Sequence, residues 1–101
     1  MYKPLPESLT IKKSGIHDLG LFADQIILRG TNLGTCHIKI GEHILRTPLG
    51  GFINHSNTPN SAKVELRANG DESIRKKWSL VTLQDIKEGE EITLRYTFYN
   101  I

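Results

Sequence analysis

Short runs in which apolar and polar residues alternate recur along the whole chain. A period of two indicates β-strands with one buried face. No window of twelve or more residues holds the period of a helix, and Gly and Pro are scattered throughout. We therefore expect a mainly β protein built from many short strands. The expected strands are 9–12, 35–40, 43–46, 62–67, 74–83 and 92–96.

Turn residues separate these runs. Residues 14–20 have the composition of a loop, and Glu88-Gly89 predicts a turn before the last strand. Asn69-Gly70 is a strong hairpin signal, because both central residues of a type I′ turn need a positive φ. It predicts a hairpin in which 74–83 is the return strand of 62–67.

One segment has more polar residues than a turn requires. Residues 51–53, Gly-Phe-Ile, are strand-like and run directly into Asn-His-Ser-Asn at 54–57, followed by Pro59 and Asn60. A turn uses one or two hydrogen-bonding side chains of this kind. The excess predicts a site at this point of the chain.

Size and charge place limits on the function. The chain has 101 residues, which suits a single domain spanning 1–101, and its net charge of +2 is too small to indicate nucleic-acid binding. No apolar run has the length of a membrane span or of a signal peptide, so we expect an intracellular protein with no membrane partner. Cys36 is the single cysteine, which excludes an internal disulfide and a multi-cysteine zinc site.

Three segments together resemble a known family. They are Asp-Leu-Gly-Leu-Phe-Ala at 18–23, Phe-Ile-Asn-His-Ser with Pro-Asn at 52–60, and Ile-Lys-Glu-Gly-Glu-Glu-Ile-Thr-Leu-Arg-Tyr at 86–96. In this order they resemble the SET domain of protein lysine methyltransferases, over about residues 8–99. The second and third segments are specific, whereas the first is weak alone. The resemblance implies a β-clip-like fold of small curled sheets, in which the C-terminal segment threads a loop formed by the preceding stretch.

The resemblance also implies a cofactor, S-adenosylmethionine, which leaves as S-adenosylhomocysteine. Asn54 and His55 match the pair that lines the cofactor site, with the backbone of the histidine pairing with the adenine. Tyr96 matches the active-site tyrosine. The cofactor-binding residues implied in this way are Leu19, Gly20, Leu21, Phe22, Asn54, His55, Tyr96 and Phe98.

The implied reaction is methyl transfer to the side-chain amine of a protein lysine, with a histone or another basic protein tail as the expected partner. The lysine would enter a narrow apolar channel, for which Phe52, Phe98 and Tyr99 are the candidates. Tyr96 would orient the amine by its hydroxyl. Neither a metal nor a covalent intermediate is implied.

Departures from the family leave a second function open. The first loop commonly reads Gly-x-Gly, and here Asp18 occupies the first position, where its carboxylate would repel that of the cofactor. Asp tolerates a left-handed backbone, so the turn itself is still expected. A second site tyrosine, a pre-SET segment and a zinc-binding post-SET tail are absent from these residues, as in small viral or bacterial members. A homodimer or the substrate completes the lysine channel, or the protein is a weakly catalytic SET fold that acts as a binding module.

Other readings of polar residues are less favoured. Cys36, His37 and His43 give three potential metal ligands without a fourth, which is a poor zinc site. The run Arg75-Lys76-Lys77-Trp78 is expected to be an exposed strand face rather than a docking surface. Glu90 and Glu91 are neighbours on a strand and point to opposite faces, so solvated or structural roles are expected rather than acid–base catalysis.

Overall fold

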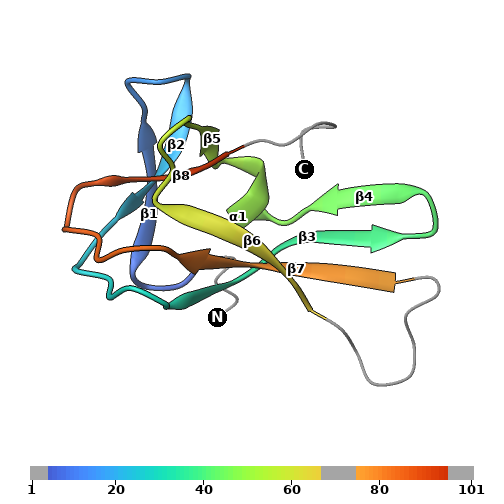
Figure 1. Ribbon diagram of the computed structural model, residues 1–101. Helices are drawn as coiled ribbons and strands as arrows, with labels where there is room; N and C mark the ends of the chain where they lie inside the picture. The colour runs from blue at the N-terminus through green and yellow to red at the C-terminus, as the bar shows by residue number, and fades with distance from the viewer. Residues whose placement is uncertain (1–4, 67–74, 96–101) are drawn as a thin grey trace.

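The computed structural model describes residues 5–66 and 75–95, and within these ranges the chain is almost entirely β (Figure 1). The elements are β1 (Leu9–Lys13), β2 (Leu19–Ala23), β3 (Asn32–Ile40), β4 (His43–Arg46), α1 (Pro48–Gly51), β5 (Asn54–His55), β6 (Ser61–Leu66), β7 (Arg75–Thr82) and β8 (Glu91–Leu94).

The strands form one curled sheet whose order differs from their order in the sequence. The order is β1-β2-β8-β6-β7-β3-β4, and β5 pairs with β8 off this path. The C-terminal strand β8 therefore lies inside the sheet, antiparallel to β2 and parallel to both β5 and β6. Strands β3, β4 and β7 project away from β1, β2 and β8, as Figure 1 shows.

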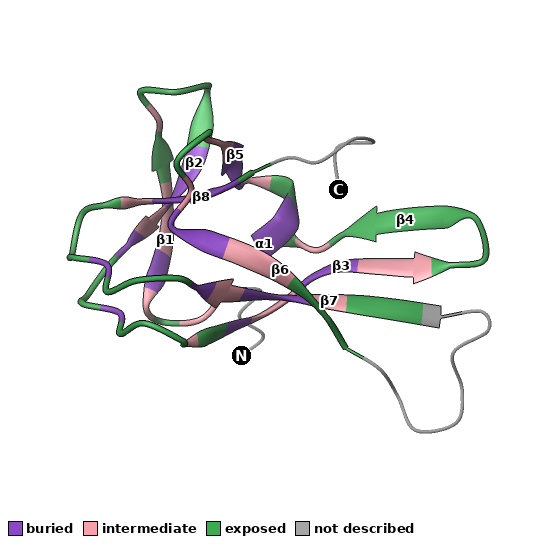
Figure 2. Cartoon of the chain, viewed as in Figure 1, coloured by how far each residue is buried: buried purple, intermediate pink, exposed green. Residues whose placement is uncertain are grey.

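The core lies where the curled sheet closes on itself. Its largest fully buried apolar side chains come from five different segments. They are Leu21, Ile53, Leu80, Ile86 and Ile92. Burial decreases along the projecting strands, where β4 is exposed at every position (Figure 2). The apolar alternation of the sequence thus specifies a small core at one end of the molecule.

The predicted strands are present, with shifted ends. The strand expected at 35–40 begins three residues earlier, and the strand expected at 74–83 is Arg75–Thr82 in its described part. The turn at Glu88-Gly89 is confirmed by a φ of 89° at Gly89 and by a hydrogen bond of 3.1 Å from the Glu90 N–H to the Lys87 carbonyl.

The strand-like reading of Gly51-Phe52-Ile53 is wrong, since β5 begins only at Asn54. Gly51 ends helix α1, and Phe52 is its C-cap with a φ of −109°. Two local features explain this outcome. Thr47 accepts a hydrogen bond of 3.4 Å from the Gly50 N–H at the N-cap, and Pro48 occupies the first turn, where its fixed φ suits a helix.

The predicted hairpin of β6 and β7 is confirmed by their antiparallel pairing, in which Leu66 lies opposite Lys77. Asn69 and Gly70, on which the turn is predicted, lie outside the described residues, so the type of turn stays a prediction.

Within the described residues, no helix is long and apolar enough to span a membrane.

Candidate functional site

The two most specific sequence segments meet in space. Asn54 and His55 of β5 pair in parallel with Thr93 and Leu94 of β8, and the Ser56 N–H donates to the Leu94 carbonyl at 3.1 Å. Parallel neighbours need a long connection, and here some forty residues separate the paired positions. We call this region, made of β5, β8 and residues 56–61, the crossing. The predicted contact between the segments is confirmed.

Asn60 fastens the crossing from within. Its side-chain Nδ2 donates to the Glu91 carbonyl at 2.8 Å, and its Oδ1 accepts the Thr93 N–H at 2.9 Å. Its own N–H donates to the Thr93 hydroxyl at 3.3 Å. Asn60 is 8% exposed, so these bonds satisfy backbone groups that solvent cannot reach. Asn60 therefore acts as the partner that irregular, buried backbone requires.

Asn54 joins the crossing to the loop before β2. Its Nδ2 donates to the Glu91 carboxylate at 2.8 Å and to the carbonyls of His17 and Leu19, each at 3.2 Å. The Ser14 hydroxyl donates to the same carboxylate at 2.8 Å. Asn54 thus holds residues 17–19 against β8. Its side chain therefore has a structural role, and this does not prevent a ligand contact from its exposed part.

Gly20 is placed where a larger residue would not fit. A Cβ atom at this position would overlap the Glu91 carboxylate and would lie 3.0 Å from Asn54 Nδ2. The glycine of the first sequence segment therefore lets β2 approach this pair of side chains closely, and a larger residue would require them to move. The loop, β5 and β8 are held together by one network.

The loop before β2 turns at Asp18, as expected from the tolerance of aspartate for this conformation. Its φ is 36°, and among the described residues it is the only non-glycine with a positive φ. The Ser14 N–H donates to the Asp18 carbonyl at 2.7 Å, and the Ile16 N–H donates to Ser14 Oγ at 2.9 Å. These bonds close the loop over residues 14–18.

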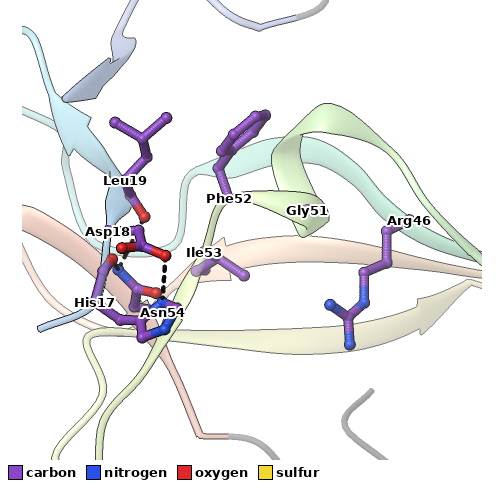
Figure 3. Close-up of a pocket in the computed structure, with 8 residues that line it drawn as sticks. All are labelled: His17, Asp18, Leu19, Arg46, Gly51, Phe52, Ile53 and Asn54. Atoms are coloured by element: carbon purple, nitrogen blue, oxygen red, sulfur yellow. Dashed lines mark hydrogen bonds and ion pairs between the residues drawn. The ribbon is translucent and has the colours of Figure 1, made fainter. Parts of the chain in front are cut away.

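Two adjoining pockets open beside Asn54. The first has a volume of about 430 Å³ and lies between the loop and the segment that follows β4 (Figure 3). It is lined by His17, Asp18, Leu19, Arg46, Gly51, Phe52, Ile53 and Asn54. The second, of about 370 Å³, is lined by Ile16, His17, Asn54 and His55. Both volumes lie within the range of roughly 300–1,000 Å³ that small-molecule sites occupy.

The structure places the predicted cofactor residues in different settings. Leu19 and Asn54 line the first pocket, and His55 lines the second. The His55 imidazole also lies 3.1 Å from Asn57 Oδ1. Leu21 is fully buried in the core, so a cofactor could reach at most its backbone. Phe22 is half-buried and lies beneath the Lys12 ammonium, which is 5.8 Å from its ring centre.

Of the predicted lysine-channel residues, Phe52 is half-buried and lines the first pocket. Tyr96, Phe98 and Tyr99 lie outside the described residues. The predicted roles of these four residues therefore stay predictions.

The cysteine and its neighbouring histidine are buried rather than available to a ligand. Burial raises the pKa of the Cys36 thiol to about 11, and its Sγ lies 3.4 Å from the Trp78 carbonyl. Burial, with the charges of Lys63 and Arg46, lowers the pKa of His37 to about 4. In the described part of the chain, no three His, Cys, Asp or Glu side chains are grouped as a metal site.

Sequence reasoning did not find three residues of the site. Ser14 and His17 were read only as loop residues, and Arg46 only as the end of a strand. Each reaches the site across 28 or more positions of the chain, so no local signal could have shown them. Glu91 was assigned a solvated or structural role, and its hydrogen bonds to Ser14 and Asn54 show that it is structural.

A sequence model described as the SET domain matches residues 39–97, which is more than half of the chain. The chain belongs to the SET-domain family. The match includes the crossing and β8, the regions that carry the hydrogen-bond network. Family membership supports methyl transfer as the general class of activity.

The SET fold is also supported by solved structures. A crystal structure of a Plasmodium falciparum protein, named as a candidate histone methyltransferase, matches with a TM-score of 0.73 over 92% of this chain and 96% of that chain. Its sequence is 19% identical, so the likeness shows the fold alone. It is one of 145 matching chains. No curated protein sequence matches significantly.

Proposed function

We propose that this protein transfers a methyl group from S-adenosylmethionine to the side-chain amine of a protein lysine. One observation carries the proposal: two pockets of small-molecule size adjoin at Asn54, on the network that joins the loop, β5 and β8. In a SET-domain chain, this is the region that the family resemblance assigns to the cofactor.

The residues present fit such a ligand. The pockets share His17 and Asn54, so an elongated molecule could occupy both. Asn54 and His55 would hold its nucleoside part, and the wall formed by Asp18, Leu19 and Arg46 would face its amino-acid part. When bound, S-adenosylmethionine supplies an electrophilic methyl group on a sulfonium.

The protein must present the lysine as a neutral amine. A free lysine has a pKa near 10.4, so roughly one amine in a thousand is neutral near pH 7, and securing that form is worth about 4 kcal/mol. An apolar channel disfavours the charged form and needs no strong base. We assign this channel to Phe52 with Phe98 and Tyr99, and the orientation of the amine to Tyr96.

The direct test is transfer of labelled methyl from the cofactor to protein lysines in a lysate, followed by mass spectrometry of the products. We expect Tyr96→Phe to reduce the rate at least 100-fold while cofactor binding is retained. Tyr2→Phe is the matched control and should keep the rate of the unchanged protein. Full activity of Tyr96→Phe would remove the role assigned to this hydroxyl.

The substrate class follows from the same proposal. The Plasmodium structural neighbour is named for histones, and a basic tail is the partner we propose to test first. Histone mixtures and lysine-to-arginine peptides, assayed in parallel, would show whether the acceptor is a lysine. If the activity per protein molecule rises with protein concentration, and sedimentation shows association over the same range, a homodimer completes the channel.

A second candidate function is that of a binding module with little catalysis, and it is favoured by Asp18 at the pocket wall. Calorimetry with S-adenosylhomocysteine separates the two. The enzyme should bind this product in the micromolar range. Absence of binding at millimolar ligand would favour the module.

A further inference from the structure

The first pocket has charged groups of opposite sign on its two sides. Asp18, in the loop before β2, lies on one side, and Arg46, at the end of β4, lies on the other (Figure 3). Phe52 and Ile53 lie between them in this view. A ligand seated in the pocket would therefore have a carboxylate on one side and a guanidinium on the other.

We propose that Asp18 and Arg46 form a charge pair across the pocket that selects a zwitterionic α-amino acid group. Arg46 would receive the ligand's α-carboxylate, and Asp18 would receive its α-ammonium. The inference rests on the proposed function for the rest of the ligand, and it adds which residues of this chain determine specificity for the amino-acid end.

The chemistry of the two side chains fits these roles. A guanidinium presents several N–H donors in one plane and matches a carboxylate in a bidentate geometry. A carboxylate only accepts hydrogen bonds, and an ammonium only donates them. An α-amino acid carries both charges on one carbon, so a pocket with one cation and one anion on facing walls is complementary to it.

The backbone of Asp18 indicates that its position is specified. A φ of 36° costs energy for a residue with a side chain, and such conformations persist where the surrounding structure determines them. The Asp18 carbonyl accepts the Ser14 N–H at 2.7 Å, which fixes the loop. Asp18 Oδ2 lies 3.5 Å from Nδ1 of His17, which also lines the pocket. The backbone of Asp18 is thus fixed by its own loop, and its side chain, which is 84% exposed, lies at the rim of the pocket where a ligand can reach it.

This reading gives Asp18 the opposite effect from the one expected from the sequence. If the carboxylate of Asp18 faced that of the ligand, removing its charge would strengthen binding. If it faces the ammonium, removing its charge weakens binding. Asparagine tolerates the same backbone conformation, so Asp18→Asn changes the charge without changing the turn. The sign of the effect decides between the two.

The experiment measures equilibrium binding by calorimetry at low salt. The ligands are S-adenosylhomocysteine, its decarboxylated analogue and 5′-methylthioadenosine, which lacks the amino-acid group. The variants are Asp18→Asn, Arg46→Gln and, as a matched control, Arg29→Gln, since Arg29 is exposed and does not line either pocket.

We expect Arg46→Gln to weaken S-adenosylhomocysteine binding about tenfold and Asp18→Asn to weaken it about fivefold, as ion pairs at a partly exposed site do. Both variants should bind 5′-methylthioadenosine within twofold of the unchanged protein, and Arg29→Gln should bind all ligands normally. Arg46→Gln and the unchanged protein should bind the decarboxylated analogue equally well, because this ligand has no α-carboxylate for Arg46 to receive. Raised salt should reduce the preference for the full ligand.

Any other outcome contradicts a specific part of the proposal. Tighter binding by Asp18→Asn would show that its carboxylate repels the ligand's carboxylate and would end the assignment to the ammonium. Equal losses for all three ligands in Arg46→Gln would show a general structural effect. Failure of the unchanged protein to bind any of the ligands would contradict the proposed function itself, whereas binding without discrimination would contradict only this inference.

Discussion

The crossing and the projecting strands are both built from β-strands, but they differ in how far their side chains are buried and hydrogen-bonded. In the crossing, Asn60 and Thr93 are each 8% exposed and their polar atoms bond one another. In the projecting region, which we call the arm and define as β3, β4 and β7, β4 is exposed throughout. Leu45 is 53% exposed there, and Lys39 lies opposite Lys76 with like charge.

The difference shows which region of the fold is restricted to a single backbone arrangement. Long-range backbone pairing with side-chain hydrogen bonds gives the crossing one arrangement, because each buried polar group that lost its partner would be costly. The arm pairs by antiparallel strands alone, locally between β3 and β4 and over some forty residues between β3 and β7, and its exposed faces tolerate varied side chains. The candidate site lies where the loop before β2 and the segment after α1 meet Asn54 and His55 of the crossing, with only Arg46 supplied by the arm.

The largest expected effect on stability comes from removing the Asn60 side chain, which hydrogen-bonds the backbone of β8 in the crossing. Asn60→Ala leaves the Thr93 N–H and the Glu91 carbonyl without their side-chain partner, and it should reduce the free energy of unfolding by about 4 kcal/mol. Denaturant unfolding measures this loss. Asn32→Ala is the matched control in the arm, since its exposed side chain accepts one local bond from the Gly34 N–H, and it should cost less than about 1 kcal/mol. Equal losses would remove the distinction between the regions.

The next effect tests His37, a buried ionisable group of the arm. His37 is 2% exposed, and its pKa is lowered from 6.5 to about 4 by burial and by the charges of Lys63 and Arg46. The unfolded state therefore binds a proton more readily between these values, and stability should fall as pH drops from 6.5 towards 4, by up to about 3 kcal/mol.

Unfolding measured at intervals across this pH range checks the prediction for His37. The variant His37→Gln removes the titration, so its stability should depend less on pH than that of the unchanged protein. Identical pH profiles for the two proteins would show that His37 does not carry the effect.

A smaller effect is expected at the join between β2 and the crossing. Gly20→Ala places a methyl group against the Glu91 carboxylate and Asn54, and moving them weakens their hydrogen bond, at a cost of about 2 kcal/mol. Gly51→Ala has open space around its Cβ and should change stability by less than about 0.5 kcal/mol. Thermal unfolding of both variants gives the comparison, and an unperturbed Gly20→Ala would show that the approach of β2 is adaptable.

The smallest effect is expected on the surface of the arm. Leu45→Thr keeps a residue that suits strands and removes apolar area that is already half exposed, so stability should change by less than about 0.5 kcal/mol. Unfolding should be measured at several protein concentrations. A loss above 1 kcal/mol that grows with protein concentration would show that the arm is covered by another molecule in solution.

The sequence carried more of the fold than of the site. Alternation predicted the strands because local burial on one face leaves a period of two in the chain. It failed at 51–53, where Thr47 and Pro48 cap a short helix that ends at Gly51. This error comes from a local signal that a different local interaction, the helix cap, outweighs.

By itself the sequence determined that segments 52–60 and 86–96 belong together, since their residues match one family. Only the tertiary structure decided what they do to each other. Asn60 hydrogen-bonds the backbone of β8, and the Glu91 carboxylate accepts hydrogen bonds from Asn54 and Ser14. Arg46 and Asp18 line the same pocket. These contacts join positions 28 to 77 residues apart, and no local period records them. Long-range hydrogen bonding and packing, rather than local propensity, determine the site.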